Sequence, residues 1–548
     1  MQLKKNPILK QGRPVAWAVR LMLRVCWFAC LLMLLQPWAS RAADTYDQTI
    51  LAIQKQIESG NLDQARSLIA EAARRFPHNG GVENLLGVVE IQQGNTAAAS
   101  KAFSQAIAHN PRLTGAYLNL ARMKMEGAAT DRTVRAEALR LSLKILQLEP
   151  TNEEANYQAA TIFFWNKDYR SSLAQLEKLS AAGRQKIGAQ ALLCADHAAL
   201  GPAQAAAEAA HALAANPDLT EQDAETCLAG LRSAHRADLI DLLYSAAATR
   251  HALSPAGLRI VGLAQEAEGK FQLARTTLES AFAANPQSVD ILEDLARVAK
   301  AANDNQGALG YLAHARDLQP DNAALPYEFA AVCVRMGLLA EARKALTEAL
   351  RLSPDNADYN LAMGIVVSFS ADPSKAIPYL TRYHSLRPKD PRGVLELGAA
   401  SYRGKDYETA TRWLREAVTD PTTAPDAHYY LGRIARQEGR LDVATAELKE
   451  ALAMRPDQPD ALAELGQISL QSRQFDQASS YFDQSLRKDP DNYGANFGLL
   501  QLYARTGDAR RDQQAHRFEQ IKDMKQEQEK EMMRVIEIRP NDPMHSPN

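Results

Sequence analysis

Residues 262–286 read GLAQEAEGKFQLARTTLESAFAANP, and residues 432–456 read GRIARQEGRLDVATAELKEALAMRP. In both stretches a glycine is followed seven residues later by a second glycine, and then by Ala, Leu, Ala and Pro at the same offsets. Prolines close most segments of this kind, and from Pro286 to Pro490 they stand 33 to 35 residues apart. Such a fixed period indicates an array of similar units rather than one globular core.

Each position of the repeat has a physical role, and together these roles indicate a pair of helices. A small residue such as Gly262 lets a second helix cross closely, and the second glycine, Gly269, suits a turn with positive φ. The Ala–Leu–Ala series, at spacings of four and three, forms one face of the second helix. The proline ends that helix, and a neighbouring Asp or Asn, as in residues 354–356, caps the next one.

This pattern resembles the tetratricopeptide repeat family, whose unit is a helix–turn–helix of about 34 residues. The first-helix tryptophan of that family is absent here, so the match is to a degenerate form. The resemblance implies an all-α, right-handed superhelical solenoid of about thirteen repeats, which spans roughly residues 45–508. Its stability would come from interfaces between neighbouring pairs, because one pair alone cannot bury its apolar face.

The regularity of the pattern divides the chain into expected regions. We expect N-terminal repeats over residues 45–150, degenerate helical repeats over 151–255, and regular repeats over 256–508. Five extra residues before Pro150 are expected in the inter-helix loop at residues 127–133. A charged capping helix is expected over 509–538, and a disordered tail over 539–548. The alternative for the charged segment is a short coiled coil that joins two chains, because Met532, Met533, Ile536 and Ile538 add apolar weight.

The first 42 residues read as a targeting segment. They carry seven basic residues and no acidic one, and an apolar run of eleven residues follows at 25–35. That run is too short to span a bilayer as a helix, which favours a secretory signal peptide cut after Ala42. The alternative is an uncleaved signal anchor that would keep the protein on the membrane. Either way the chain is expected to be exported, to the periplasm or the outside of the cell.

Charge and motifs exclude several classes of function. The whole chain carries a net charge of −2 and the first 42 residues carry +7, so the remainder carries −9, which disfavours nucleic-acid binding. No metalloprotease, nucleophile-elbow or dinucleotide-binding motif is present, so we expect no enzyme activity, cofactor or metal. The three cysteines outside the targeting segment, Cys194, Cys227 and Cys333, read as buried helix residues. A single disulfide between Cys194 and Cys227 is the alternative.

A binding surface is what remains. The family resemblance implies a concave groove lined by the first helix of each pair, and Tyr and Arg are the side chains most enriched at protein interfaces. The central and late repeats place these candidate partner-binding residues in the groove: Arg259, Arg297, Tyr327, Tyr402, Arg403, Tyr429, Arg433 and Arg436. Tyr402 would instead be a core residue if the register of its repeat is off by one.

Because the candidate surface is cationic, an extended acidic segment of another protein is the expected partner. The expected function is therefore a non-catalytic scaffold in an extracytoplasmic compartment, which the resemblance connects with envelope assembly or export. Two alternatives stay open. One is an accessory subunit of an envelope enzyme or glycan-handling system, and the other is a membrane-anchored adaptor built from the same repeats.

Overall fold

The computed structural model describes residues 41–533, with side chains for residues 45–526. These residues form 29 α-helices and no strand. Apart from the four-residue α10, the helices follow one another as thirteen antiparallel pairs and a final pair closed by the last helix. The predicted all-α repeat fold is confirmed. The predicted signal segment, apart from Arg41 and Ala42 at the start of α2, and the predicted C-terminal tail lie outside the described residues. Within the described part, no helix is both long and apolar enough to cross a membrane.

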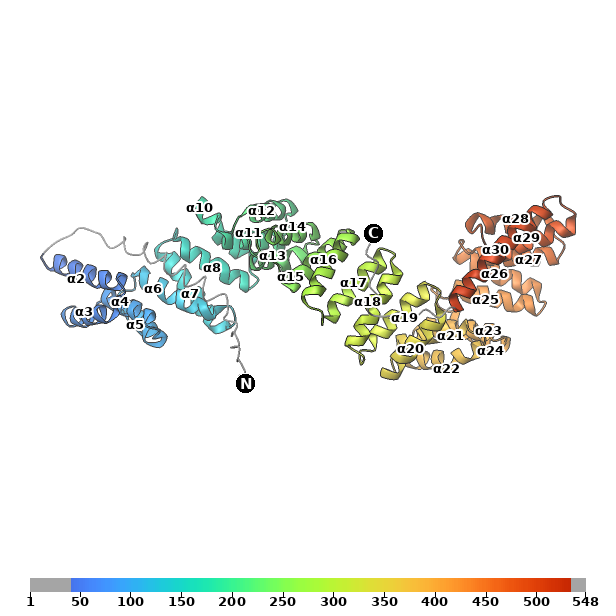
Figure 1. Cartoon of the computed structure of the whole chain (residues 1–548), viewed down its shortest axis with the longest axis horizontal. Coiled ribbons are helices and arrows are strands. Elements are labelled where there is room, and N and C mark those ends of the chain that lie inside the picture. The colour runs from blue at the N-terminus through green and yellow to red at the C-terminus, as the bar shows by residue number, and fades with distance from the viewer. Residues whose placement is uncertain (1–40, 534–548) are drawn as a thin grey trace, which may run out of the picture. The chain divides into compact units, whose positions relative to one another are not determined.

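The chain divides into two compact units, Met1–Leu253 and Ser254–Asn548, which are described separately. In both, Figure 1 shows helices stacked in pairs that follow the order of the sequence. The helices of the first unit are α2 (Arg41–Glu58), α3 (Leu62–Arg75), α4 (Gly80–Gln92), α5 (Thr96–His109), α6 (Thr114–Ala128), α7 (Arg132–Leu148), α8 (Glu153–Trp165), α9 (Tyr169–Leu176), α10 (Ala181–Arg184), α11 (Ile187–Leu200), α12 (Ala203–Ala215), α13 (Glu221–Ser233) and α14 (Ala237–Ala248).

The second unit holds the regular repeats. Its helices are α15 (Pro255–Ala267), α16 (Phe271–Ala284), α17 (Val289–Ala301), α18 (Asn305–Leu318), α19 (Ala324–Arg335), α20 (Leu339–Leu352), α21 (Ala357–Ser368), the short 3₁₀ turn η2 (Pro373–Ala376), α22 (Ile377–Leu386), α23 (Pro391–Arg403), α24 (Tyr407–Ala417), α25 (Ala424–Gln437), α26 (Leu441–Met454), α27 (Pro459–Gln471), α28 (Phe475–Lys488), α29 (Tyr493–Thr506) and α30 (Arg511–Met533). Consecutive pairs pack on each other from α15 to α30.

The small residue of each repeat lies where the two helices of a pair cross. A Cβ built on Gly262 would come within 2.6 Å of Leu278 Cγ, and one on Gly432 within 2.7 Å of Leu448 Cγ. Real Cβ atoms do not approach carbon so closely, so these positions accept only glycine without a shift of the facing leucine. The sequence interpretation of the first glycine as a helix-crossing residue is therefore correct for both pairs.

The second glycine of each repeat lies in the turn, where φ is positive. Gly269 has φ 76° and Gly439 has φ 77°, and six non-glycine residues adopt the same conformation elsewhere, among them Arg473 at φ 60°. The turn at Arg473 keeps the hydrogen bonds of the glycine turns, with the Gln474 N–H donating to the Ser469 carbonyl at 2.8 Å. The backbone geometry of the repeat is thus conserved although the residue that suits it best is missing.

Substitution at this turn should stabilise the protein. A side chain in the left-handed region costs about 1 kcal/mol, so Arg473→Gly should raise the free energy of unfolding by about that amount. The mirror experiment, Gly439→Ala, should lower it by a similar amount because it brings the same penalty into a turn that lacks it. Urea unfolding followed by circular dichroism measures both changes, and a destabilised Arg473→Gly protein would contradict this explanation.

The extra residues before Pro150 do not form a loop. The turn between α6 and α7 is as short as the one between α4 and α5, whereas α6 has 15 residues and α7 has 17, compared with 13 and 14 in the preceding pair. The expectation of a longer loop at residues 127–133 was therefore wrong. The insertion lengthens both helices, because added residues that continue the apolar face can stay helical and bury more surface.

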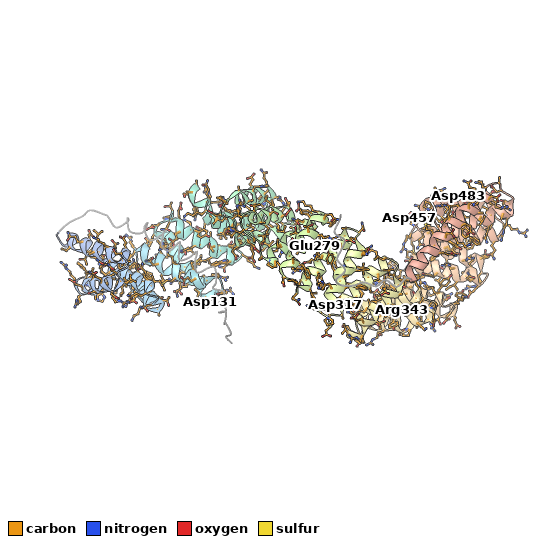
Figure 2. The ribbon with its side chains drawn as sticks, in the orientation of Figure 1. Asp131, Glu279, Asp317, Arg343, Asp457 and Asp483 are labelled. Carbon is orange, nitrogen blue, oxygen red and sulfur yellow. The ribbon has the colours of Figure 1, made fainter. Side chains whose placement is uncertain are left out.

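Polar side chains connect neighbouring pairs on the second-helix side of the stack. Glu279 on α16, labelled in Figure 2, accepts a hydrogen bond from the Tyr311 hydroxyl on α18 at 2.7 Å. Arg275 pairs with the same carboxylate at 3.1 Å and also reaches Asp304, which caps α18, at 2.9 Å. Such contacts fix the spacing of consecutive pairs, although exposed ion pairs add little stability individually.

The last helix, α30, covers the apolar end of the stack, as a terminal capping helix must. Phe518 and Ile521 are buried against α29, with the Phe518 ring 5.0 Å from Tyr493 and 5.2 Å from Phe497. Met524, one turn farther along the helix than Ile521, is 41% exposed. Farther along, α30 also approaches α20 (Figure 1). The apolar residues that suggested a coiled coil lie beyond the described side chains.

Candidate functional site

The first helices of the second unit form a continuous layer, because α21, α23, α25 and α27 contact one another in order. We call this the first-helix layer. Five of the eight candidate residues lie on two adjacent members of it. Tyr402 and Arg403 end α23, while α25 carries Tyr429, Arg433 and Arg436.

Arg403 lies at the centre of the first group of contacts. Its guanidinium lies 4.2 Å from the ring centroid of Phe369, which follows α21. It donates hydrogen bonds to the Ser368 hydroxyl at 3.0 Å and to the Tyr430 hydroxyl at 3.1 Å. A cation placed over an aromatic face is attracted by the ring quadrupole, so this arginine is oriented by three partners from two other helices and turns.

Arg433 lies at the centre of the second group. Its guanidinium lies 5.1 Å from the ring of Tyr402 and 5.5 Å from that of Tyr429, and it donates to the Tyr429 hydroxyl at 3.3 Å. The Tyr430 ring lies 5.4 Å from both of these tyrosine rings and so connects the two groups. Arginines and aromatic rings alternate across α21, α23 and α25, which gives a rigid surface with two kinds of recognition chemistry.

An acidic side chain from the next repeat completes this surface. Glu464 on α27 lies 3.0 Å from Arg433 Nε and 2.6 Å from Arg436 Nε, and its side chain is only 13% exposed. One carboxylate therefore pairs with two of the arginines that the sequence placed in a cationic groove, and the three side chains together keep one net positive charge. We name these residues together the tyrosine–arginine cluster: Phe369, Tyr402, Arg403, Tyr429, Tyr430, Arg433, Arg436 and Glu464.

Exposure divides the cluster into a support and a contact surface. Burial raises the pKa of the Tyr402 and Tyr429 hydroxyls. It also raises the pKa of Glu396, which precedes Arg403 on α23. Phe369, in contrast, is 58% exposed and is among the most exposed large apolar side chains described. The half-buried tyrosines hold the arginines in place, and the Phe369 ring, which carries the Arg403 plane on one face, remains open to a partner.

The three other candidate residues form separate contacts. Arg259 on α15 lies 2.5 Å from one oxygen of Asp294, and Arg297 on α17 lies 2.5 Å from the other. Tyr327 on α19 packs its ring 4.8 Å from that of Tyr359. The structure thus brings together five of the eight candidates, and it places these three on the first helices α15, α17 and α19 of earlier repeats, outside the cluster.

Phe369, Tyr430 and Glu464 were missed by the sequence reasoning, and for Glu464 a signal existed. An acid stands two residues before the small residue of the repeat at Asp294, Glu328 and Glu464. Each of these carboxylates pairs with a cation of the preceding repeat. A sequence analysis that considered acidic as well as basic residues on the first helices would have predicted these ion pairs between successive repeats. Phe369 follows the end of α21, outside the helical pattern, so the repeat gives no signal for it.

A separate hollow of about 1110 Å³ opens in the first unit, between α5, α7 and the end of α8. Its lining includes Trp165 and the basic side chains Arg132, Arg140, Lys144 and Lys167. None of the candidate residues lies there. No three side chains suited to metal ligation come together within the described residues.

Comparison with known proteins identifies the repeat. Two family models, both described as tetratricopeptide repeat, match the chain, one over residues 56–123, 299–364 and 435–483, the other over residues 261–323 and 463–511. The second and third segments of the first model and both segments of the second lie in the unit that carries the cluster. Among curated proteins no match is found.

Solved structures with similar arrangements come from distant proteins. The APC/C hetero-tetramer Cut9–Hcn1 matches with a TM-score of 0.36 and 14% identity over 84% of this chain and 97% of that one. Yeast Tom70 matches with a TM-score of 0.37 and 16% identity over 89% and 94%. A tetratricopeptide repeat protein of Parabacteroides merdae gives a TM-score of 0.41 and 15% identity over 45% and 98%. The matching segments and the stacked helix pairs show that the chain contains tetratricopeptide-like repeats within an all-α superhelical array.

Proposed function

We propose that the chain is a non-catalytic scaffold that binds an extended segment of a partner protein on the tyrosine–arginine cluster. Repeats of this family are typically protein-interaction modules, so protein partners in general follow from the fold. The observation that carries the proposal is the exposed Phe369 ring beneath the Arg403 guanidinium. An exposed aromatic residue next to an arginine with a fixed orientation loses little entropy on binding, which is why such pairs dominate interface energies.

We propose further that the scaffold acts outside the cytoplasm, in assembly or export at the cell envelope. The basic and apolar composition of residues 1–42 supports this. Cell fractionation together with N-terminal sequencing of the purified protein tests the placement. A mature chain that begins near Asp44 in the envelope or periplasmic fraction is expected, and an uncut chain in the cytoplasm would refute it.

The proposed binding surface is tested by a double substitution, Phe369→Ala with Arg403→Ala. Proteins that the wild-type chain enriches from an envelope extract are identified first, and the affinity of each is then measured by calorimetry. Loss of two interface anchors should weaken binding by about 30-fold or more, because each such truncation typically costs at least about 1 kcal/mol.

The matched control is Val443→Ala, which truncates a 42% exposed side chain on the second helix α26. This control should bind as the wild type does and unfold at nearly the same temperature, because an exposed side chain adds little stability. The double variant also loses the hydrogen bonds of Arg403 to Ser368 and Tyr430, so its fold is checked by circular dichroism before binding is measured. If the double variant binds every enriched protein with unchanged affinity, the partner surface lies elsewhere on the chain.

The charge of the partner is tested at Glu464. An acidic partner must compete with this carboxylate for Arg433 and Arg436, so Glu464→Gln should strengthen binding of an acidic peptide by about fivefold at low salt. A neutral peptide with the same aromatic residues should bind both proteins equally. Fluorescence anisotropy with the two labelled peptides measures the difference, and equal gains for both peptides would show that the partner need not be acidic.

A further inference from the structure

The cysteines of the first unit meet across a helix interface. Cys194 on α11 and Cys227 on α13 are both fully buried. The Cys227 thiol lies 3.4 Å from the carbonyl oxygen of Ala191, one turn before Cys194 on the same face of α11. The Cys194 thiol is the largest influence that raises the pKa of Cys227, followed by burial. Each thiol is therefore the other's close neighbour, although both are free in the structure.

The two helices approach each other more closely here than side chains of ordinary size permit. A Cβ built on Gly230, one turn after Cys227, would come within 2.9 Å of the Ala195 carbonyl oxygen and 3.0 Å of Ala198 Cβ. A disulfide requires Cα atoms about 4.4 to 6.8 Å apart, a distance that helices reach only where small residues separate them. The interface of α11 and α13 is of this kind, because Ala, Gly and Cys line both faces.

We infer that Cys194 and Cys227 form a disulfide that links α11 to α13 when the chain folds in the presence of a disulfide oxidant. The thiolate of one cysteine attacks the oxidant R–S–S–R and releases one R–SH. The second cysteine then displaces the other R–SH from the mixed disulfide. Two thiol protons pass to the two released thiols, so that one protein disulfide forms and one small disulfide is reduced. Because both cysteines are buried in the folded protein, the exchange must take place during folding, before α11 packs against α13.

The disulfide would stabilise the part of the array in which the helices bury the least apolar surface. The second helix α9 has only eight residues, and α12 consists mainly of alanine, which buries little apolar area for each residue ordered. A bond that closes the chain between 194 and 227 restricts the unfolded state by the entropy of a loop of that length. Reduction should therefore lower the midpoint of thermal unfolding of this unit by about 10 °C.

The test is refolding of the full chain in a mixture of oxidised and reduced glutathione, followed by acid quenching, alkylation and mass spectrometry. Both cysteines fall within one tryptic peptide, residues 187–232, because no Lys or Arg interrupts it. This peptide should lose two hydrogens and take no alkyl label. Cleavage after Glu208, Glu221 and Glu225 should then leave two fragments that separate only on reduction.

Cys333 on α19 is the internal control, since it is equally buried but has no cysteine beside it. It should carry the alkyl label in every sample. Alkyl label on both Cys194 and Cys227 after oxidative refolding would overturn the inference, as would a disulfide that joins either of them to Cys26, Cys30 or Cys333. Because the disulfide is detected in peptides of the wild-type chain, the result does not depend on whether a Cys194→Ser or Cys227→Ser protein folds. The result is also independent of the proposed partner surface.

Discussion

The first unit should become less stable as pH rises from about 4 to about 7, and Asp196→Asn should remove most of this slope. Asp196 on α11 is fully buried beside the Ser172 hydroxyl, and burial, which outweighs this contact, raises its pKa to about 7. The folded state therefore holds a proton that the unfolded state releases near pH 4. The stability contributed by the protonated form is complete below pH 4 and is lost as pH rises to about 7, a change of about 4 kcal/mol.

Urea unfolding at several pH values, followed by a probe placed in the first unit, measures this effect. The asparagine variant keeps the shape of the side chain but cannot ionise, so it isolates the contribution of Asp196 from that of other carboxyl groups. Its stability should match or exceed that of the wild type at pH 8 and fall below it at pH 4. Parallel pH profiles for the two proteins would show that Asp196 reaches water in solution.

Phe482→Ala should be the most damaging single truncation in the C-terminal repeats, with a cost of about 3 to 5 kcal/mol. The ring of Phe482 on α28 is fully buried between Gly466 on α27 and Gly498 on α29. No side chain from either glycine can fill the space that the substitution leaves. The repeats from α27 to α30 should therefore unfold first, while pairs several repeats away keep their stability, because each repeat contacts only its neighbours.

Hydrogen exchange resolved by peptide locates this loss of stability. The matched variant is Phe482→Leu, since leucine occupies the same position opposite Gly262 and Gly432 in other pairs, and it should cost much less. The exposed Phe369→Ala should cost under about 0.5 kcal/mol. A loss of protection spread evenly over the second unit in Phe482→Ala would contradict neighbour-limited stability.

Much of the fold could be predicted from the sequence, because the close crossing of the two helices in each pair determines the size of the residues at fixed positions of the repeat. Gly432 with Leu448, and Gly466 with Phe482, show that a large side chain on the second helix leaves no room for a Cβ on the first helix at these crossings. This complementarity recurs with the repeat and needs no knowledge of distant contacts. The lengthened helices α6 and α7 were missed, because an insertion changes the spacing without showing which element receives it.

The candidate site was less predictable, because its contacts join different repeats. Arg433 and Arg436 lie on the expected layer, but their partner Glu464 belongs to the next repeat and changes the charge of the surface. Phe369 leaves the helical pattern at the end of α21 and meets Arg403 only after the chain has passed through α22. Helical periodicity predicts which residues share a face, whereas the pairing of faces depends on how the repeats stack.

Site-specific cross-linking at Phe369 tests the central claim most directly, because it reports contact rather than affinity. A photoreactive phenylalanine analogue replaces Phe369, and the same analogue replaces Val443 as the control; both natural side chains are exposed. Irradiation in an envelope extract should link a defined partner segment to position 369 and not to position 443. Equal labelling of both positions, or labelling at 443 alone, would contradict a partner surface on the tyrosine–arginine cluster.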